Sequence, residues 1–185
     1  NGAMTSLNVG NNSIPVKNMN ELIALVEAKP AMKLLCAVPF RATTITELDV
    51  SGQSLGVEGA VVIRRYLENN GALVKFDISN NKLSMEGGKA IAVALKGNSI
   101  MTDLNIASND LGIKADRSKH DMSGIIAISD AIPTMGALAK FTFSGDREYS
   151  KPVTLETTMT KANFSGKFLQ ASGAIMLAAF LPKCQ

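Results

Sequence analysis

Apolar side chains recur along this chain every 28 residues. Residues 73–83 and 101–111 have apolar side chains at matching positions, and in both segments an asparagine (Asn81, Asn109) stands two residues before the final leucine. A repeat of this length cannot bury its apolar face alone, so consecutive copies must stack. We therefore expect a single stacked domain over residues 1–185. Its strand units, about seven in number, are predicted to start near residues 4, 32, 45, 73, 101, 138 and 159.

A helix is predicted after most of these strand units. Glycines follow the end of the template at a fixed distance, as Gly59, Gly87 and Gly173 show. Beyond each glycine the apolar residues recur at intervals of three and four, for example at Ile91 and Leu95, which is the spacing of one face of an α-helix. Each unit is therefore expected to consist of a short strand and an amphipathic helix.

The pattern L-x-x-L-x-L-x-x-N-x-L followed by a helix resembles the leucine-rich repeat, and its length resembles the ribonuclease-inhibitor-like class of 28 residues. The resemblance implies an α/β solenoid of horseshoe shape. In such a fold a parallel sheet lines the concave side and helices line the convex side. The resemblance also implies a protein-binding function.

The asparagines have a physical role in this pattern. Where the chain leaves a strand and turns, buried backbone groups need partners, and an asparagine amide both donates and accepts hydrogen bonds. Asn12, Asn81 and Asn109 are expected to fill this role, with Gln53 and Asp146 as substitutes. Phe40 and Lys167 stand at the same position in two other copies and cannot do so, hence two irregular repeats are expected.

Three segments depart from the 28-residue spacing. The copy that starts at Met32 is too short to contain a helix, and a polar insertion occupies residues 113–122. Residues 146–152 replace another helix and predict an excursion or a short hairpin. Insertions in repeat proteins often lie on the binding face, although they are also tolerated as neutral variation.

Composition and charge exclude several classes of protein. The 19 basic and 16 acidic residues give a net charge of +3, which is low for a nucleic-acid-binding protein. No apolar stretch approaches the roughly 20 residues of a membrane span. We therefore expect no membrane insertion. The two cysteines fit neither a disulfide framework nor a zinc site, so we expect a cytoplasmic location.

Catalytic chemistry has few candidates in this sequence. His120 is the single histidine and lies in the polar insertion, which favours a solvated side chain. The run Gly87-Gly88-Lys89 lacks the Ser or Thr and the first Gly of a phosphate-binding loop. We therefore predict no enzymatic activity, no cofactor and no metal site.

Recognition has better support. Side chains between the apolar residues of each strand point to the face away from the helices, because successive residues of a strand alternate faces. Thirteen residues are predicted on this concave surface as a partner-binding site: Asn8, Lys33, Cys36, Glu47, Asp49, Lys75, Asp77, Asp103, Asn105, Lys140, Thr142, Lys161 and Asn163.

The favoured function is a non-catalytic protein-interaction scaffold that uses the concave sheet and the inserted loops. One alternative is a regulator of a small GTPase, since Ran-type GTPase-activating proteins resemble this repeat class, but their acidic C-terminal tail is not matched by Lys183-Cys184-Gln185. Another alternative is a structural subunit of a larger assembly. Because both ends fall at one phase of the repeat, we also expect a segment of a longer array or end-to-end self-association.

Overall fold

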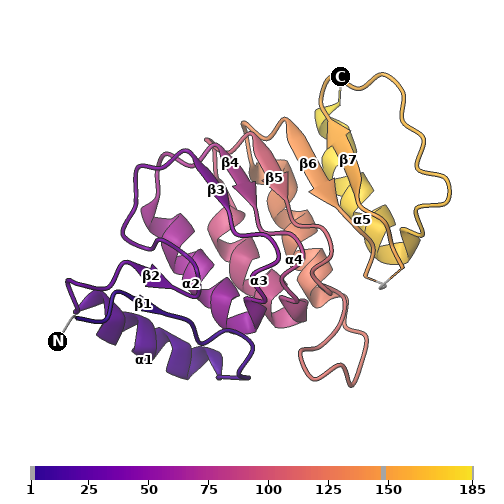
Figure 1. The fold of residues 1–185 in the computed structure, drawn as a ribbon. Coiled ribbons are helices and arrows are strands. Elements are labelled where there is room, and N and C mark those ends of the chain that lie inside the picture. Colours follow the sequence, from indigo (N-terminus) through magenta and orange to yellow (C-terminus); the bar gives the residue numbers. More distant parts are fainter. Residues whose placement is uncertain (1–2, 147–148, 185) are drawn as a thin grey trace.

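The computed structural model describes residues 3–146 and 149–184 and shows a mixed α/β fold (Figure 1). The strands are β1 (Ser6–Leu7), β2 (Leu34–Leu35), β3 (Glu47–Asp49), β4 (Lys75–Asp77), β5 (Asp103–Asn105), β6 (Lys140–Phe143) and β7 (Val153–Glu156). The helices are α1 (Val16–Glu27), α2 (Gly56–Asn69), α3 (Ser84–Leu95), α4 (Ser123–Ala131) and α5 (Gln170–Phe180), with 3₁₀ turns at Ile132–Thr134 and Leu181–Lys183. None of the helices in these ranges is long and apolar enough to cross a membrane.

Strands β3 to β7 form one sheet in sequence order, and β1 and β2 form a separate pair. In the larger sheet Leu48 lies beside Phe76, which lies beside Leu104, so the two steps from β3 to β5 are each one 28-residue repeat. Strand β6 continues the parallel arrangement with Phe141 beside Leu104, whereas β7 pairs with β6 in the antiparallel sense. The predicted parallel sheet is therefore confirmed from β3 to β6 and wrong at β7.

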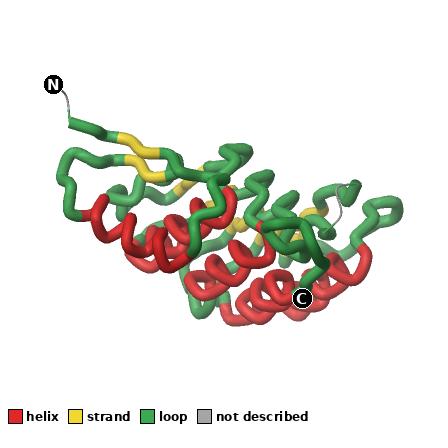
Figure 2. Tube along the Cα trace, turned by 90° about the horizontal axis from the view of Figure 1, so that it is seen from below, coloured by secondary structure: helices red, strands yellow, loops and turns green. Residues whose placement is uncertain are grey.

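The helices line up on one side of the strands, as the view from below shows (Figure 2). The middle residue of β3, β4 and β5 faces them and is buried: Leu48, Phe76 and Leu104 are all part of one core. Burying a side chain of this size stabilises the fold by about 1.5–3 kcal/mol. Glu47 and Asp49, on either side of Leu48, are exposed. We call the side of the sheet to which these polar residues belong the open sheet face.

Two glycines allow α3 and α4 to approach each other closely. A Cβ atom added at Gly124 would lie 2.5 Å from the carbonyl oxygen of Leu111 and 2.7 Å from that of Met85. A Cβ atom at Gly88 would lie 3.2 Å from the Cα atom of Gly124. Larger residues at Gly124 would therefore force the two helices apart.

Asparagine side chains connect neighbouring repeats at the turns after the strands. The Nδ2 atom of Asn81 donates to the carbonyl oxygens of Val50 and Ile78, and its Oδ1 accepts the backbone N–H of Gln53. Asn109 repeats the pattern one unit later, donating to Ile78 and Ile106. The predicted role of these asparagines is confirmed.

Asn12 and the two predicted substitutes make different sets of contacts at the same position. Asn12 donates to the carbonyl oxygens of Val9 and Gly10 within its own turn. The side chain of Gln53 reaches only the Ser51 carbonyl oxygen, at 3.3 Å. The buried carboxylate of Asp146 accepts the hydroxyl of Ser172 instead, and thereby joins the turn after β6 to α5.

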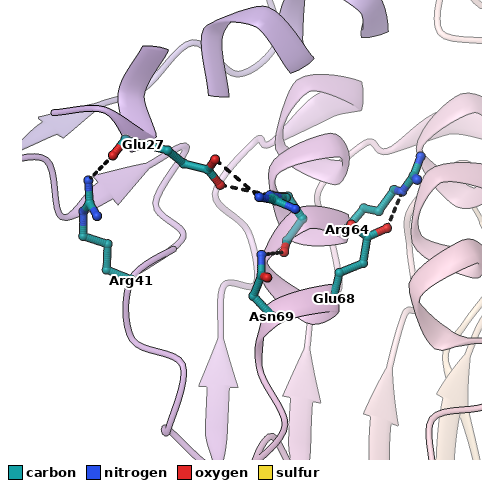
Figure 3. A network of polar contacts seen from close by, with 6 residues as sticks. Glu27, Arg41, Arg64, Glu68 and Asn69 are labelled. Atoms are coloured by element: carbon teal, nitrogen blue, oxygen red, sulfur yellow. Dashed lines mark hydrogen bonds and ion pairs between the residues drawn. The ribbon is translucent and has the colours of Figure 1, made fainter. Parts of the chain in front are cut away.

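The copy that starts at Met32 contains no helix, as predicted, and Arg41 connects it to the preceding unit. The Arg41 guanidinium donates to the carbonyl oxygens of Met32 and Lys29 at 2.8–3.0 Å. It also donates to the carbonyl oxygen of Glu27 at 2.8 Å (Figure 3). Glu27 is the last residue of α1, where backbone carbonyls have no intrahelical donor and a cation is favourable. Cys36 and Ala37 in this copy have left-handed backbone angles, so the turn before Phe40 is irregular.

A buried glutamate joins the first unit to the third. The carboxylate of Glu58, in the first turn of α2, accepts the backbone N–H groups of Asn11, Asn12 and Ile14 at 2.7–3.2 Å. Glu58 is 1% exposed. Because each of these bonds involves a charged acceptor, they hold the N-terminal turn firmly against α2.

The two longer departures also have defined structures. Residues 113–120 form a tight excursion closed by a bridge between Ile113 and His120. Strands β6 and β7 form a hairpin, as residues 146–152 predicted, with Arg147 and Glu148 outside the described residues. The strand expected after Met159 is absent from residues 157–169, because β7 already occupies the edge of the sheet beside β6.

Candidate functional site

The open sheet face presents a row of alternating charges. Glu47, Lys75, Asp103, Lys140 and Glu156 lie side by side on β3 to β7. The Lys75 ammonium lies 2.6 Å from the Glu47 carboxylate, and the Lys140 ammonium lies 2.9 Å from the Asp103 carboxylate. The hydrogen bond from Lys140 to Asp103 raises the pKa of Lys140. Each lysine is therefore paired with a carboxylate on the preceding strand.

A second row lies two residues further along the strands. It consists of Asp49, Asp77, Asn105, Thr142 and Thr154. The Asn105 amide donates to the Asp77 carboxylate at 2.7 Å, and the hydroxyls of Thr142 and Thr154 are 2.9 Å apart. These bonds restrict the side-chain rotamers, so the row presents a defined surface.

Asp49 and Asp77 are neighbours without a lysine or arginine partner among the described residues. The backbone N–H of Ser51 donates to Asp49, and the hydrogen bonds from Ser51 lower the pKa of this carboxyl. Ser79 donates its backbone N–H and its hydroxyl to Asp77. These two carboxylates make the β3–β4 end of the face acidic.

The surface between the two rows is shallow. A depression of about 220 Å³ lies over β3 to β6, lined by residues of both rows. It is smaller than the sites of about 300–1,000 Å³ that enclose a small-molecule ligand. Its shape suits an extended contact with another surface better than a substrate pocket.

The structure brings together eight of the thirteen residues predicted on the concave surface. These are Glu47, Asp49, Lys75, Asp77, Asp103, Asn105, Lys140 and Thr142. Asn8 and Lys33 are exposed beside the separate β1–β2 pair. Lys161 and Asn163 are exposed in the irregular segment after β7, away from any strand.

The prediction that Cys36 lies on the concave surface is wrong. Its side chain is fully buried in the core, where burial raises the pKa of the thiol. The left-handed backbone at Cys36, with φ of 47°, ends the strand alternation just after Leu35 and turns the side chain inward. Cys36 therefore cannot contact a partner at the surface.

Thr154 and Glu156 belong to the open sheet face but were not predicted. Residues 153–156 read Val-Thr-Leu-Glu, an alternation of apolar and polar residues that is typical of a strand with one buried face. The 28-residue template does not include this segment. A search for two-residue periodicity in the hairpin region could have found them.

The candidates for catalysis remain unassembled. The His120 Nδ1 atom lies 3.4 Å from the Asp146 carboxylate, and Ser172 donates its hydroxyl to that carboxylate rather than to His120, so these three residues do not place a nucleophile on its base. Lys89 lies within helix α3 rather than in a glycine-rich loop. The described residues contain no group of three or more His, Cys, Asp or Glu side chains placed to hold a metal ion.

Comparison with known proteins identifies one repeat directly. A family model described as Leucine Rich repeat matches residues 72–92, which span β4 and most of α3. No curated protein matches the chain. The matched segment includes Phe76, Asn81 and Gly87, which occupy the buried strand, turn and helix positions of the repeat. The chain therefore contains a leucine-rich repeat at residues 72–92, and this motif indicates a protein-interaction module.

Proposed function

We propose that the whole chain is a leucine-rich repeat solenoid of the ribonuclease-inhibitor-like class and acts as a non-catalytic scaffold that binds a protein partner. The open sheet face is the proposed contact surface. The 28-residue register from β3 to β5, with Leu48, Phe76 and Leu104 in one row, supports this class. Stacked repeats provide an extended surface rather than an enclosed pocket.

One observation supports the binding surface most strongly. The open sheet face carries two rows of polar side chains, most of which have hydrogen-bond or ion-pair partners within the protein and remain accessible to solvent. Ion pairs and hydrogen bonds fix these side chains before a partner arrives. A preordered surface loses less conformational entropy on binding than a mobile one.

The charges on this face favour a partner with a basic patch. The open sheet face has two lysines but five carboxylates, at Glu47, Asp49, Asp77, Asp103 and Glu156. Asp49, Asp77 and Glu156 have no ion-pair partner among the described residues, and Asp49 and Asp77 lie next to each other. Complementary charges across an interface steer association and select partners.

The decisive experiment compares two double variants of equal charge change. Partners are captured with the wild-type chain, and their binding to the purified variants is then measured by biolayer interferometry. We expect Asp49→Lys with Asp77→Lys to abolish binding. Glu21→Lys with Asp130→Lys, at exposed positions on α1 and α4, is expected to leave it within about twofold because surface charges far from the contact are screened by salt.

The result that would refute the site is equally clear. If the Asp49/Asp77 variant keeps its circular dichroism spectrum and binds as tightly as the Glu21/Asp130 variant, the open sheet face is not the contact surface. Steady-state turnover of a substrate by the wild-type chain would refute the non-catalytic role.

A further inference from the structure

A second surface lies at the edge of the sheet where the strands turn into helices. Its floor is formed by the turns after β4 and β5, and residues 113–120 form one wall. The cavity has a volume of about 600 Å³. We call it the turn-side groove; it is within the size range of sites that enclose a ligand or several side chains.

Basic side chains dominate this groove. Among the described residues, Lys82, Arg117 and Lys119 line it together with one carboxylate, that of Asp110. Arg117 pairs with Asp110 at 2.9 Å. Lys82 and Lys119 are exposed and have no acidic partner among the described residues, unlike Lys75 and Lys140 on the open sheet face.

Backbone hydrogen bonds and a contact with Asp146 hold the wall of the groove in place. The backbone of Lys114 donates to the Lys119 carbonyl oxygen, and that of Asp121 donates to the Gly112 carbonyl oxygen. His120 contacts the buried carboxylate of Asp146, against which Gly112 packs without room for a Cβ atom. The cationic side chains of Arg117 and Lys119 therefore belong to a folded segment rather than to a free loop.

Two exposed aromatic rings contact each other at the groove, and one of them lines it. Tyr149, which lines the cavity, is 56% exposed, and Phe168 is 55% exposed. The rings meet edge to face with their centroids 5.5 Å apart. Aromatic side chains contribute most to the binding energy when a partner buries them, and Tyr and Arg are frequent among the hot-spot residues of interfaces.

We propose that the turn-side groove binds an acidic segment of a partner protein, with its carboxylates on Lys82 and Lys119 and an aromatic side chain against Tyr149 and Phe168. Unpaired cations select the acidic residues, and the exposed rings select the apolar one. This site is separate from the open sheet face, which is acidic and is expected to meet a basic patch. The two sites can therefore succeed or fail independently.

The test uses a defined probe and the full chain. The probe is a fluorescein-labelled decamer of Asp and Glu residues with one central Phe, and binding is followed by fluorescence anisotropy at 50 mM and 300 mM NaCl. We expect saturable binding that weakens at the higher salt, because screening reduces exposed charge interactions. Replacing the central Phe of the probe by Ser should weaken binding several-fold.

Charge-reversal variants locate the site. Lys82→Glu with Lys119→Glu is expected to lower affinity by about tenfold or more. The matched control is Lys17→Glu with Lys96→Glu, which changes the net charge equally at exposed positions on α1 and at the end of α3. This control should change affinity by less than about threefold. Equal losses in the two variants would overturn the proposal, as would the absence of saturable binding at 50 mM NaCl.

Further measurements distinguish an acidic peptide from other classes of ligand. Tyr149→Ala should weaken the Phe-containing probe but leave the Ser-containing probe unchanged, and an equal effect on both would overturn the aromatic contact. Inorganic phosphate at 10 mM should compete no better than NaCl of equal ionic strength. If phosphate displaces the probe selectively, or a labelled ten-nucleotide single-stranded DNA binds more tightly than the probe, the acidic-segment assignment is wrong.

Discussion

The Oδ1 atom of Asn109 accepts the backbone N–H of Asn81 at 2.8 Å, so two residues that are 28 positions apart hold adjacent turns together. Both side chains are buried. The bond converts the period of the sequence into a spatial contact between repeats. Stability in such an array is approximately a sum of unit terms and nearest-neighbour terms, and this bond belongs to the second kind.

Removing the amide of Asn81 should be costly. Asn81→Ala deletes bonds to the Val50 and Ile78 carbonyl oxygens and to the Gln53 N–H, in a fully buried position. Each unsatisfied buried group costs about 1–3 kcal/mol, so we expect the free energy of unfolding in urea to fall by about 3 kcal/mol or more. Asn12→Ala, at an exposed turn, should cost about 1 kcal/mol or less. Equal costs would contradict the burial argument.

Leu104 tests the register of the repeat. Leu104→Ala opens a cavity in the row that contains Phe76 and Phe141, and we expect a loss of about 2–5 kcal/mol in the free energy of unfolding. Leu25→Ala, at a position 65% exposed on α1, should change it by less than about 0.5 kcal/mol. A surface-like cost at Leu104 would mean that the register is wrong.

Glu58 should control the order of the N-terminal turn. Glu58→Ala leaves the N–H groups of Asn11, Asn12 and Ile14 without their acceptor. Because part of this turn is exposed and water can replace the carboxylate, we expect a cost of about 2 kcal/mol. Hydrogen exchange followed by mass spectrometry should show faster exchange in residues 11–14 and unchanged exchange in β5. Unchanged exchange in residues 11–14 would show that the turn is held by other contacts.

The two cysteines should differ in reactivity. Burial raises the pKa of the Cys36 thiol, so at neutral pH this residue has little thiolate and is shielded from reagents. Cys184 is partly exposed. Iodoacetamide at pH 7.5 should label Cys184 first, with Cys36 labelled only on unfolding, as read by peptide mass spectrometry. Equal native-state rates would place Cys36 at the surface.

The Lys140–Asp103 pair predicts a pH dependence at the alkaline end. The pKa of Lys140 is raised in the folded state, so its contribution is complete below the unfolded pKa of about 10.4 and is lost as the pH rises through the folded value. An exposed pair is worth at most about 1 kcal/mol, which corresponds to a Tm decrease of no more than about 4 °C for Lys140→Met at pH 7.

That Tm difference between the wild type and Lys140→Met should shrink as the pH is raised toward 11, as read by differential scanning fluorimetry. Lys161→Met, at an exposed position outside the strands, serves as the control and should match the wild type at every pH. A Tm difference that is constant with pH would mean that Lys140 acts through packing alone.

Local spacing made several features predictable. The alternation around Leu48, Phe76 and Leu104 and the 28-residue interval between Asn81 and Asn109 follow from the geometry of a strand and a turn. These signals depend on neighbouring residues or on a fixed period along the chain. The missing helix after Met32 and the hairpin after β6 were predictable for the same reason, because a segment that is too short cannot contain a helical crossover.

Other features depended on contacts between distant segments. A left-handed backbone turned Cys36 into the core, and β7 took the sheet edge that the template assigned to the strand after Met159. Likewise, the contact of His120 with Asp146 arises only when the insertion folds over the turn after β6.

The sequence by itself determined the strand-and-helix repeat and the polar character of the open sheet face, because periodicity dictates which side chains share a face. Only the tertiary structure decided the direction of β7, the burial of Cys36 and the grouping of Lys82 with Lys119 in one groove. The physical reason is that strand pairing and loop packing bring together residues whose separation along the chain has no fixed period.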